Sequence, residues 1–302
     1  MSEVSSAAAE TIEVGGHTVA LTNLDRVLFP ATGFTKRDLV AYALAVAPVL
    51  VPHLRGRPLS LGRFPDGVDG RGFLQNTCRG SPPWLRTLEL RLATGTLRRY
   101  CLIDDAASLA WVANLSTIEL HPYPVDAAAP DRPVQLVLDL DPGPGAGLRE
   151  CAAVALRLAD ELRDRGLDPA VKTSGATGLH LAAAVAEGTT FADTRALARG
   201  LAERLASQRP AAVTADARPA QRAGRVLVDW QQNAARRSTI APYSLRAADR
   251  PGVSAPLLWD EVAALAAGAP PSSVDLDPLQ VLERAGRHGD LYAAALRGAA
   301  RR

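Results

Sequence analysis

One short apolar segment constrains this chain more than any other, the run Leu136–Gly143 with the sequence LVLDLDPG. Its unbroken Val and Leu content predicts a buried strand, and Pro142 with Gly143 predicts a turn directly after it. Side chains two residues apart on a strand point to the same face, about 6.5 Å apart. Asp139 and Asp141 are therefore expected to emerge side by side where a buried strand ends.

Two carboxylates this close repel each other unless a cation lies between them. Oxygen ligands of this kind favour hard divalent ions such as Mg²⁺ or Mn²⁺. A second apolar run, Val226–Trp230, also contains a carboxylate, Asp229. If the two strands are neighbours, the three acids form the cluster that two-metal phosphoryl and nucleotidyl transferases use. The structural alternative is that one aspartate caps the turn and the other is solvated.

A glycine-containing turn lies between these strands in the segment Lys172–Leu181, KTSGATGLHL. Gly175 and Gly178 bracket free amides and hydroxyls, and His180 follows on the next strand, a combination that can hold a phosphate. The segment is not a P-loop, because it lacks the GK[ST] ending. An ordinary hairpin explains this segment, taken alone, about as well.

The rest of the chain alternates helices and strands irregularly, which predicts an α/β (α+β) fold with two sheet-based lobes packed into one compact catalytic domain. We expect residues 1–10 to be a disordered leader and residues 11–302 to be a single domain, with lobes of about 11–130 and 131–302. Helices are expected at Lys36–Leu54 after a Thr35 cap, Asp105–Leu115 after an Asp104 cap, Leu148–Gly166, Phe191–Gln208 and Pro278–Arg297. Strands are expected in a hairpin over Thr11–Leu21 and at Pro58–Phe64, Gly72–Asn76, Thr87–Leu92, Thr96–Ile103, Ile118–Pro122, Val134–Asp141, Ala170–Thr173, Leu179–Val185 and Arg225–Trp230.

Composition and sequence pattern argue against several classes of protein. The longest apolar stretch, Tyr42–Val51, is too short to span a bilayer, and no secretory signal precedes it, so we expect a cytoplasmic protein with no membrane partner. The net charge of +2 does not by itself indicate nucleic-acid binding. Cys78, Cys101 and Cys151 are widely spaced and odd in number, which favours reduced core thiols over disulfides.

Several motifs together amount to a family resemblance. They occur in the order NLDRVLFP, IELHP, DLDPGPG, KTSGxxGLHL and VDWxQN, the last followed by TIAPYSLR, over nearly the whole chain from about Leu21. This set resembles the polymerase domain of bacterial ATP-dependent DNA ligase D, of the archaeo-eukaryotic primase superfamily. That family fills gaps and extends ends in non-homologous end joining. The chain has no room for a ligase or phosphoesterase domain and no KxDG motif, so we expect a stand-alone copy.

The resemblance implies roles for particular residues. Asp139, Asp141 and Asp229 would hold two Mn²⁺ or Mg²⁺ ions where the primer 3′ hydroxyl is activated. Positions matching residues that contact the incoming NTP or dNTP are Arg63, Phe73, Ser174, His180, Gln232 and Arg246. His121 matches a histidine near the metals, and Asn23, Arg26 and Lys36 match the pocket for a DNA 5′ phosphate. Without the resemblance we would interpret Phe73 as a core residue, His121 as structural, Asn23 as a cap and the two cations as solvated.

The chain also departs from the family pattern. Gly62, Gln75 and Thr177 stand where relatives carry lysines, and Leu74 replaces an aromatic residue. Each cation missing near a triphosphate costs about 1 to 3 kcal/mol of charge-assisted contact, so we expect weakened nucleotide affinity.

Three hypotheses follow. The leading one is a metal-dependent nucleotidyltransferase that extends DNA primers at gaps and ends, favouring ribonucleotides and working with a separate DNA ligase and an end-binding protein. The alternative is a catalytically weak or inactive module that binds 5′-phosphorylated DNA ends. A third, a dehalogenase-type phosphatase with Asp139 as nucleophile, is disfavoured because Gly143 stands where that chemistry needs a hydroxyl residue.

Overall fold

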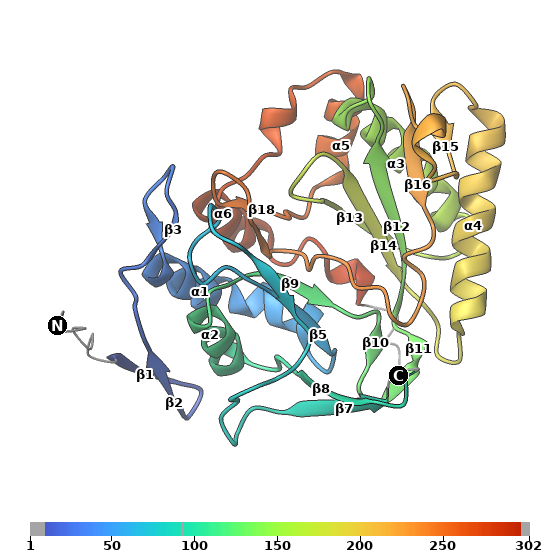
Figure 1. Ribbon diagram of the computed structural model, residues 1–302. Coiled ribbons are helices and arrows are strands. Elements are labelled where there is room, and N and C mark those ends of the chain that lie inside the picture. Colours follow the sequence, from blue (N-terminus) through green and yellow to red (C-terminus); the bar gives the residue numbers. More distant parts are fainter. Residues whose placement is uncertain (1–9, 92–93, 297–302) are drawn as a thin grey trace.

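A mixed five-stranded sheet forms the centre of the second lobe in the computed structural model, which describes residues 10–91 and 94–296 (Figure 1). The strand order is β13-β14-β12-β16-β15, with β12 antiparallel to both of its neighbours and β15 parallel to β16. The strands are β12 (Gln135–Pro142), β13 (Pro169–Thr173), β14 (Leu179–Ala184), β15 (Val213–Thr214) and β16 (Val226–Asp229). The predicted DLD strand is therefore the central strand of this sheet.

Helices cover one face of this sheet. They are α3 (Leu148–Arg163), α4 (Phe191–Gln208) and α5 (Trp259–Ala267). The apolar side chains of α3 recur at helical spacing and pack into a core with the leucines of β12. Thr190 begins α4, because its hydroxyl accepts a hydrogen bond from the Asp193 amide while the Asp193 carboxylate accepts one from the Thr190 amide. Leu136, Leu138 and Leu140 of β12 lie in the apolar core beneath these helices.

The first lobe is built on two packed helices and several small sheets. Its helices are α1 (Lys36–Leu54) and α2 (Ala106–Asn114). Its strands are β1 (Glu10–Val14), β2 (His17–Leu21), β3 (Val27–Phe29), β4 (Phe34–Thr35), β5 (Leu59–Arg63), β6 (Phe73–Gln75), β7 (Thr87–Arg91), β8 (Leu97–Cys101) and β9 (Thr117–Pro122). Within the described residues, α1 alone has the length and apolar content of a membrane span, but 56% of that stretch is buried in the protein. Length and composition do not distinguish it from a core helix.

The sequence predicts a single boundary between the two lobes near residue 130. In the structure the chain crosses between the lobes more than once. The hairpin β10 (Val125–Asp126) and β11 (Ala129–Pro133) precedes β12, and after β16 the chain returns through β17 (Leu245–Arg246), β18 (Gly252–Val253) and α6 (Pro278–His288). Short 3₁₀ turns lie at Pro219–Gln221, Pro271–Ser273 and Ala293–Ala295. The returning segment packs into the first-lobe core, where the Tyr42 hydroxyl donates to the Tyr243 carbonyl at 2.8 Å and His53 contacts Asp290 at 2.9 Å.

Three expected boundaries differ from the structure, and the end of the final helix differs most. Asp105, not Asp104, caps α2, because the Asp104 carboxylate accepts hydrogen bonds from the Gly56 amide and the Arg86 guanidinium instead. The final helix ends at His288, since Gly289 takes a positive φ of 68°. The expected leader lies outside the described residues except for Glu10, which belongs to β1.

The cysteine prediction is also wrong for two of the three residues. Cys78 and Cys101 form a disulfide with their Cα atoms 5.0 Å apart, and only Cys151 is a free, buried thiol among the described residues. The Cys78 amide donates to the Arg99 carbonyl, which draws the loop after β6 alongside β8. Sequence spacing did not reveal the pair because 23 residues separate the two cysteines and the pairing depends on this tertiary contact.

Candidate active site

The five-stranded sheet has two chemically different faces because side chains alternate along each strand. The leucines of β12 lie in the core covered by the helices, whereas Val137 belongs to the first-lobe core. Asp139 and Asp141 share the parity of Val137 and therefore lie on the face toward the first lobe. We call this the inner face.

Strand register assembles a row of four polar side chains across the inner face. Lys172 is opposite His180, His180 is opposite Asp139, and Asp139 is opposite Asp229. Directly opposed residues of antiparallel strands share a face, with Cβ atoms about 5 Å apart. The antiparallel pairing of β12 with β16 thus brings Asp229 to Asp139, and Asp141 lies two residues further along β12. Sequence reasoning had not singled out Lys172 as a site residue.

Each aspartate of this face is held by a protein donor. The His180 Nε2 atom lies 3.3 Å from Asp139 Oδ1, and an Arg222 Nη2 atom lies 3.5 Å from Asp141 Oδ2. The Asp229 carboxylate accepts hydrogen bonds from the Gln231 amide at 2.8 Å and the Gln232 side chain at 3.0 Å. Gln232, matched by resemblance to a nucleotide contact, therefore orients a carboxylate in this structure.

The pKa values of the two aspartates of β12 are shifted in opposite directions. Burial alone would raise the pKa of Asp139, but the neighbouring His180, Lys172 and Arg222 lower it below its ordinary value. The pKa of Asp141 is raised, first by burial and then by the negative charges of Asp139 and Asp229. Nearby cations thus decide the direction at Asp139, whereas burial and then the charges of Asp139 and Asp229 decide it at Asp141.

This donor set fits a hard divalent cation by its chemistry. Three carboxylates share one face, and the negative charges of Asp139 and Asp229 add to burial in raising the pKa of Asp141, a repulsion that a cation would relieve. In the side-chain conformations seen here, no group of three or more His, Cys, Asp or Glu side chains gathers tightly enough to hold a metal ion within the described part of the chain. Binding of Mg²⁺ or Mn²⁺ at these aspartates would require them to turn from their present donors.

The turn after β13 lies against the acidic strand and against Arg246. The Ser174 hydroxyl accepts hydrogen bonds from the amides of Ala176 and Gly178, which closes the turn. A Cβ atom at Gly178 would lie 2.1 Å from the Leu140 carbonyl oxygen, so only glycine allows this approach to β12. Gly175 has a φ of 70°, and a Cβ atom there would lie 2.3 Å from the Arg246 side chain. The two glycines thus place the turn between the acidic strand and a fixed cation.

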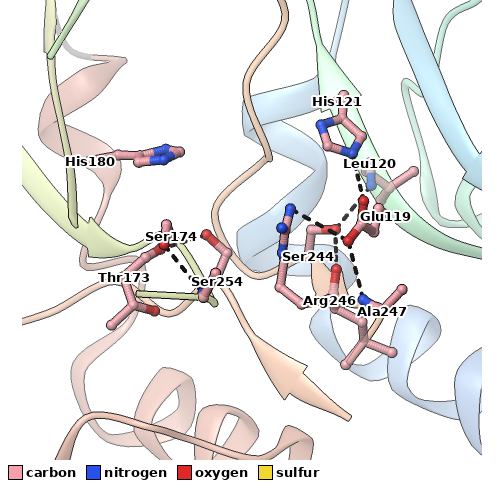
Figure 2. A network of polar contacts seen from close by, with 12 residues as sticks. Glu119, Leu120, His121, Thr173, Ser174, His180, Ser244, Arg246, Ala247 and Ser254 are labelled. Atoms are coloured by element: carbon pink, nitrogen blue, oxygen red, sulfur yellow. Dashed lines mark hydrogen bonds and ion pairs between the residues drawn. The ribbon is translucent and has the colours of Figure 1, made fainter. Parts of the chain in front are cut away.

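Glu119 joins two of the predicted residues and was missed by the sequence reasoning. Its carboxylate contacts His121 Nε2 at 3.0 Å and Arg246 Nη1 at 3.4 Å, and it accepts a hydrogen bond from the Ala247 amide at 3.1 Å (Figure 2). Burial alone would raise the pKa of Glu119, but these partners lower it. His121 is therefore attached to the triphosphate-contact candidate Arg246 through Glu119. The available sequence signal was the alternation of Glu119 and His121 on one strand.

Arg63 and Phe73 lie together at the edge of the first lobe. Arg63 donates to the Leu115 carbonyl at 2.9 Å and to the Gln75 side chain at 2.7 Å, and its guanidinium lies 5.5 Å from the centroid of the Phe73 ring. Phe73 is 46% exposed, so the interpretation of this ring as a core residue is wrong. Gln75 holds Arg63 by accepting a hydrogen bond, which a lysine at this position would not do.

Asn23, Arg26 and Lys36 are brought together at the start of α1. The Arg26 amide donates to the Asn23 carbonyl, and the Lys36 amide donates to the Arg26 carbonyl at 2.8 Å. Lys36 is only 4% exposed and its ammonium donates to the Thr22 carbonyl at 2.6 Å, so Lys36 is not the solvated charge expected without the family. Burial and the positive charges of Arg26 and Arg63 lower the pKa of Lys36 to about 8. We call Asn23, Arg26 and Lys36 the basic cluster.

The fold and the inner face define the class of this protein, a primase-like α/β domain. A family model described as "LigD, primase-polymerase domain" matches residues 35–292, and the chain belongs to this family. It is 39% identical to the multifunctional non-homologous end joining DNA repair protein LigD of Mycobacterium tuberculosis over 90% of its length and 38% identical to LigD of Mycolicibacterium smegmatis over 91%. The chain spans about a third of these relatives, 36% of each.

A solved structure gives the same assignment. The structure described as the polymerase domain from Mycobacterium tuberculosis ligase D in complex with DNA superposes with a TM-score of 0.86 at 37% identity. The match covers 92% of this chain and 98% of that one. The predicted primase-like fold is therefore confirmed.

Proposed function

We propose that this protein is a metal-dependent nucleotidyltransferase that adds nucleotides, preferentially ribonucleotides, to a DNA primer 3′ end at gaps and ends during non-homologous end joining. The observation that carries the proposal is the inner face, where Asp229 lies opposite Asp139 and Asp141 shares their side of the sheet. The solved relative in complex with DNA supports a nucleic-acid substrate.

The proposed chemistry divides between the acids and the surrounding donors. Asp139, Asp141 and Asp229 would hold two divalent ions, which when bound activate the primer hydroxyl and neutralise phosphate charge. Arg246, fixed by Glu119, supplies a cation beside the Gly175 turn, where the triphosphate would bind.

The exposed ring of Phe73 offers a surface on which a base can stack. Every base has an aromatic face, so such a platform does not select among the four bases. The adjacent Arg63 guanidinium keeps the ring in place by stacking over it.

Primer extension on a gapped duplex carrying a 5′ phosphate tests the proposal. Ribonucleotides and deoxynucleotides are compared with Mn²⁺, Mg²⁺ and a chelator. We expect incorporation only with a divalent ion, fastest with ribonucleotides and Mn²⁺. Asp229→Asn should abolish it, and Asp131→Asn, which changes an exposed aspartate on β11, is the matched control. Undiminished extension in the chelator, or by Asp229→Asn, would refute the proposal.

A second candidate function is a module that binds 5′-phosphorylated DNA ends without extending them. The basic cluster favours it, because Lys36 lies beside Arg26 and no residue of the inner face belongs to this cluster. Preferential binding of the phosphorylated duplex with no incorporation under any metal or nucleotide would establish this function in place of the first. In either case we propose that a DNA ligase and an end-binding protein complete the repair.

A further inference from the structure

Lys172 is the most buried charged side chain of the inner face, and the function proposed above gives it no role. It is 2% exposed, at one end of the row that continues through His180 and Asp139 to Asp229. Its ammonium contacts two side chains, the Ser254 hydroxyl at 2.7 Å and the His180 Nδ1 atom at 3.0 Å. A buried amine with such partners constrains the protons of the groups around it.

The direction of each hydrogen bond in this chain can be assigned from the available protons. The Ser254 hydroxyl donates its single proton to the Thr173 carbonyl at 2.7 Å, so its oxygen acts as an acceptor toward Lys172. Lys172 is therefore a donor to Ser254. At the other end, the Asp139 carboxylate is an acceptor, so His180 Nε2 must carry a proton.

These constraints leave one consistent arrangement for the His180 ring. A neutral imidazole carries one proton, and with that proton on Nε2 the Nδ1 atom is an acceptor that faces the Lys172 donor. Burial lowers the pKa of Lys172 to about 7, so below that pH Lys172 is an ammonium. An ammonium has no lone pair and can only donate toward Nδ1, which must then be an acceptor.

We propose that Lys172 is a positioning residue that fixes His180 in the tautomer with its proton on Nε2, so that one N–H points along the row to Asp139 and the triphosphate site. The catalytic part of this inference rests on the function proposed above, because it assigns to His180 a hydrogen bond with the incoming nucleotide. The tautomer itself is a property of the free protein. The two parts can therefore fail separately.

Nitrogen-15 NMR of the histidine rings tests the tautomer directly. The chain has five histidines, so the ring signals can be resolved, and His180→Gln identifies the signals of interest. In the parent protein we expect Nε2 of His180 to be the protonated nitrogen and Nδ1 to be unprotonated. A protonated Nδ1 in the parent would overturn the proposal, and this measurement needs no variant that must fold with an altered core.

Two substitutions then separate positioning from packing. Lys172→Met removes the donor, and we expect the fixed pattern of His180 to become a mixture of tautomers. Lys36→Met removes the other lysine of the chain, which is also buried, and should leave the His180 signals unchanged. An unchanged His180 pattern in Lys172→Met would contradict the proposed role. Thermal unfolding shows whether each variant is folded at the temperature used.

Steady-state kinetics test the catalytic part. Lys172→Met should raise the apparent nucleotide KM about tenfold, as expected for loss of one charge-assisted hydrogen bond, with a smaller change in kcat. Lys172→Arg, which keeps a donor, should recover part of this loss. A protonated Nε2 in a parent protein that adds no nucleotides would refute the nucleotidyltransferase proposal and leave the tautomer assignment intact. A folded Lys172→Met with unchanged KM would overturn the link between the tautomer and catalysis.

Discussion

The inner face and the basic cluster are the two charged regions of this protein, and they are built in different ways. On the inner face, functional side chains hold one another, as in the contact of Lys172 with His180 and of His180 with Asp139. In the basic cluster main-chain carbonyls are the principal acceptors, because Lys36 donates to the Thr22 carbonyl and Arg26 to the Pro65 carbonyl, and only the Asp66 carboxylate adds a charged side-chain partner for Arg26 among the described residues.

This difference predicts that the two regions respond differently to substitution. A change on the inner face alters the partners of every neighbour in the row, since interacting groups in a low-dielectric site are strongly coupled. A change in the basic cluster removes one charge and leaves the backbone that positions the others. Chemistry should therefore fail abruptly on substitution of the inner face, whereas DNA-end recognition should weaken gradually with charge, salt and pH.

The largest expected effect is on the inner face. Asp139→Asn keeps the size of the side chain but removes a charge directly opposite Asp229. We expect nucleotide addition to fall by about 1000-fold, as is typical when a principal electrostatic group of an active site is lost. Binding of gapped DNA, measured by fluorescence anisotropy, should change by less than about twofold because the basic cluster is separate. A parallel loss of binding would show that the two regions are one site.

The next effect concerns the basic cluster itself. Replacing Arg26 and Lys36 together by Ala should remove the preference for a 5′-phosphorylated gap, a loss on the order of tenfold at low salt. The parent protein should lose the same preference as salt rises, since the proposed contacts are with phosphate. Anisotropy titrations at several salt concentrations, with and without the 5′ phosphate, measure this. A preference that persists in the double variant would mean that the phosphate binds elsewhere.

Restoring the lysines that the family pattern carries should have a smaller effect, on the apparent nucleotide KM. Thr177 is exposed in the turn after β13, so Thr177→Lys should add a cation without strain and lower the apparent nucleotide KM about fivefold, or about 1 kcal/mol. Gly62→Lys should not help, because a Cβ atom there would lie 2.8 Å from Cβ of Glu119, which orients Arg246. Steady-state kinetics of both variants compare the two positions. A lower KM in Gly62→Lys would show that β5 and β9 separate easily.

The smallest expected effect is the pH dependence of end recognition. Burial, with Arg26 and Arg63 nearby, lowers the pKa of Lys36 to about 8, so its charge is present below pH 8 and is lost as the pH rises through that value. The preference for a 5′ phosphate should therefore fall about threefold between pH 7 and pH 9, because one of the cations proposed to bind the phosphate is neutralised. Lys36→Met should bind more weakly and show no such step. An equal step in that variant would assign the titration to another group.

Part of this structure could be predicted from local sequence pattern. The helix Lys36–Leu54 with its Thr35 cap and the helix Phe191–Gln208 follow from spacing and capping chemistry. Elements with weak local signals were missed, such as α5, which begins at Trp259 without a side-chain cap from its preceding residue Leu258, and the two-residue strands β17 and β18. Their positions depend on packing against the rest of the chain rather than on propensity.

One part of the acidic site could be predicted from the sequence, and the other part depended on the tertiary structure. The alternation of a strand places Asp139 and Asp141 on one side, a consequence of local backbone geometry that any reader of the sequence can derive. The addition of Asp229 depended on β16 pairing with β12 in one register, because a slip of one residue would turn its carboxylate to the helix-covered face. Ninety residues of chain separate these aspartates, and the sequence motif alone left their meeting open.

The sequence by itself determined the identity of the acids, the glycines that allow close approach and the family to which the chain belongs. Only the tertiary structure decided that Lys172 is buried against His180, that Glu119 fixes Arg246 and that Cys78 pairs with Cys101. The physical reason is that residue type sets which interactions are possible, whereas burial and partner choice come from long-range pairing. A lysine carries the same functional group on the surface and in the core, but burial shifts its pKa and fixes its hydrogen-bond partners, so there it can constrain where its neighbour carries a proton.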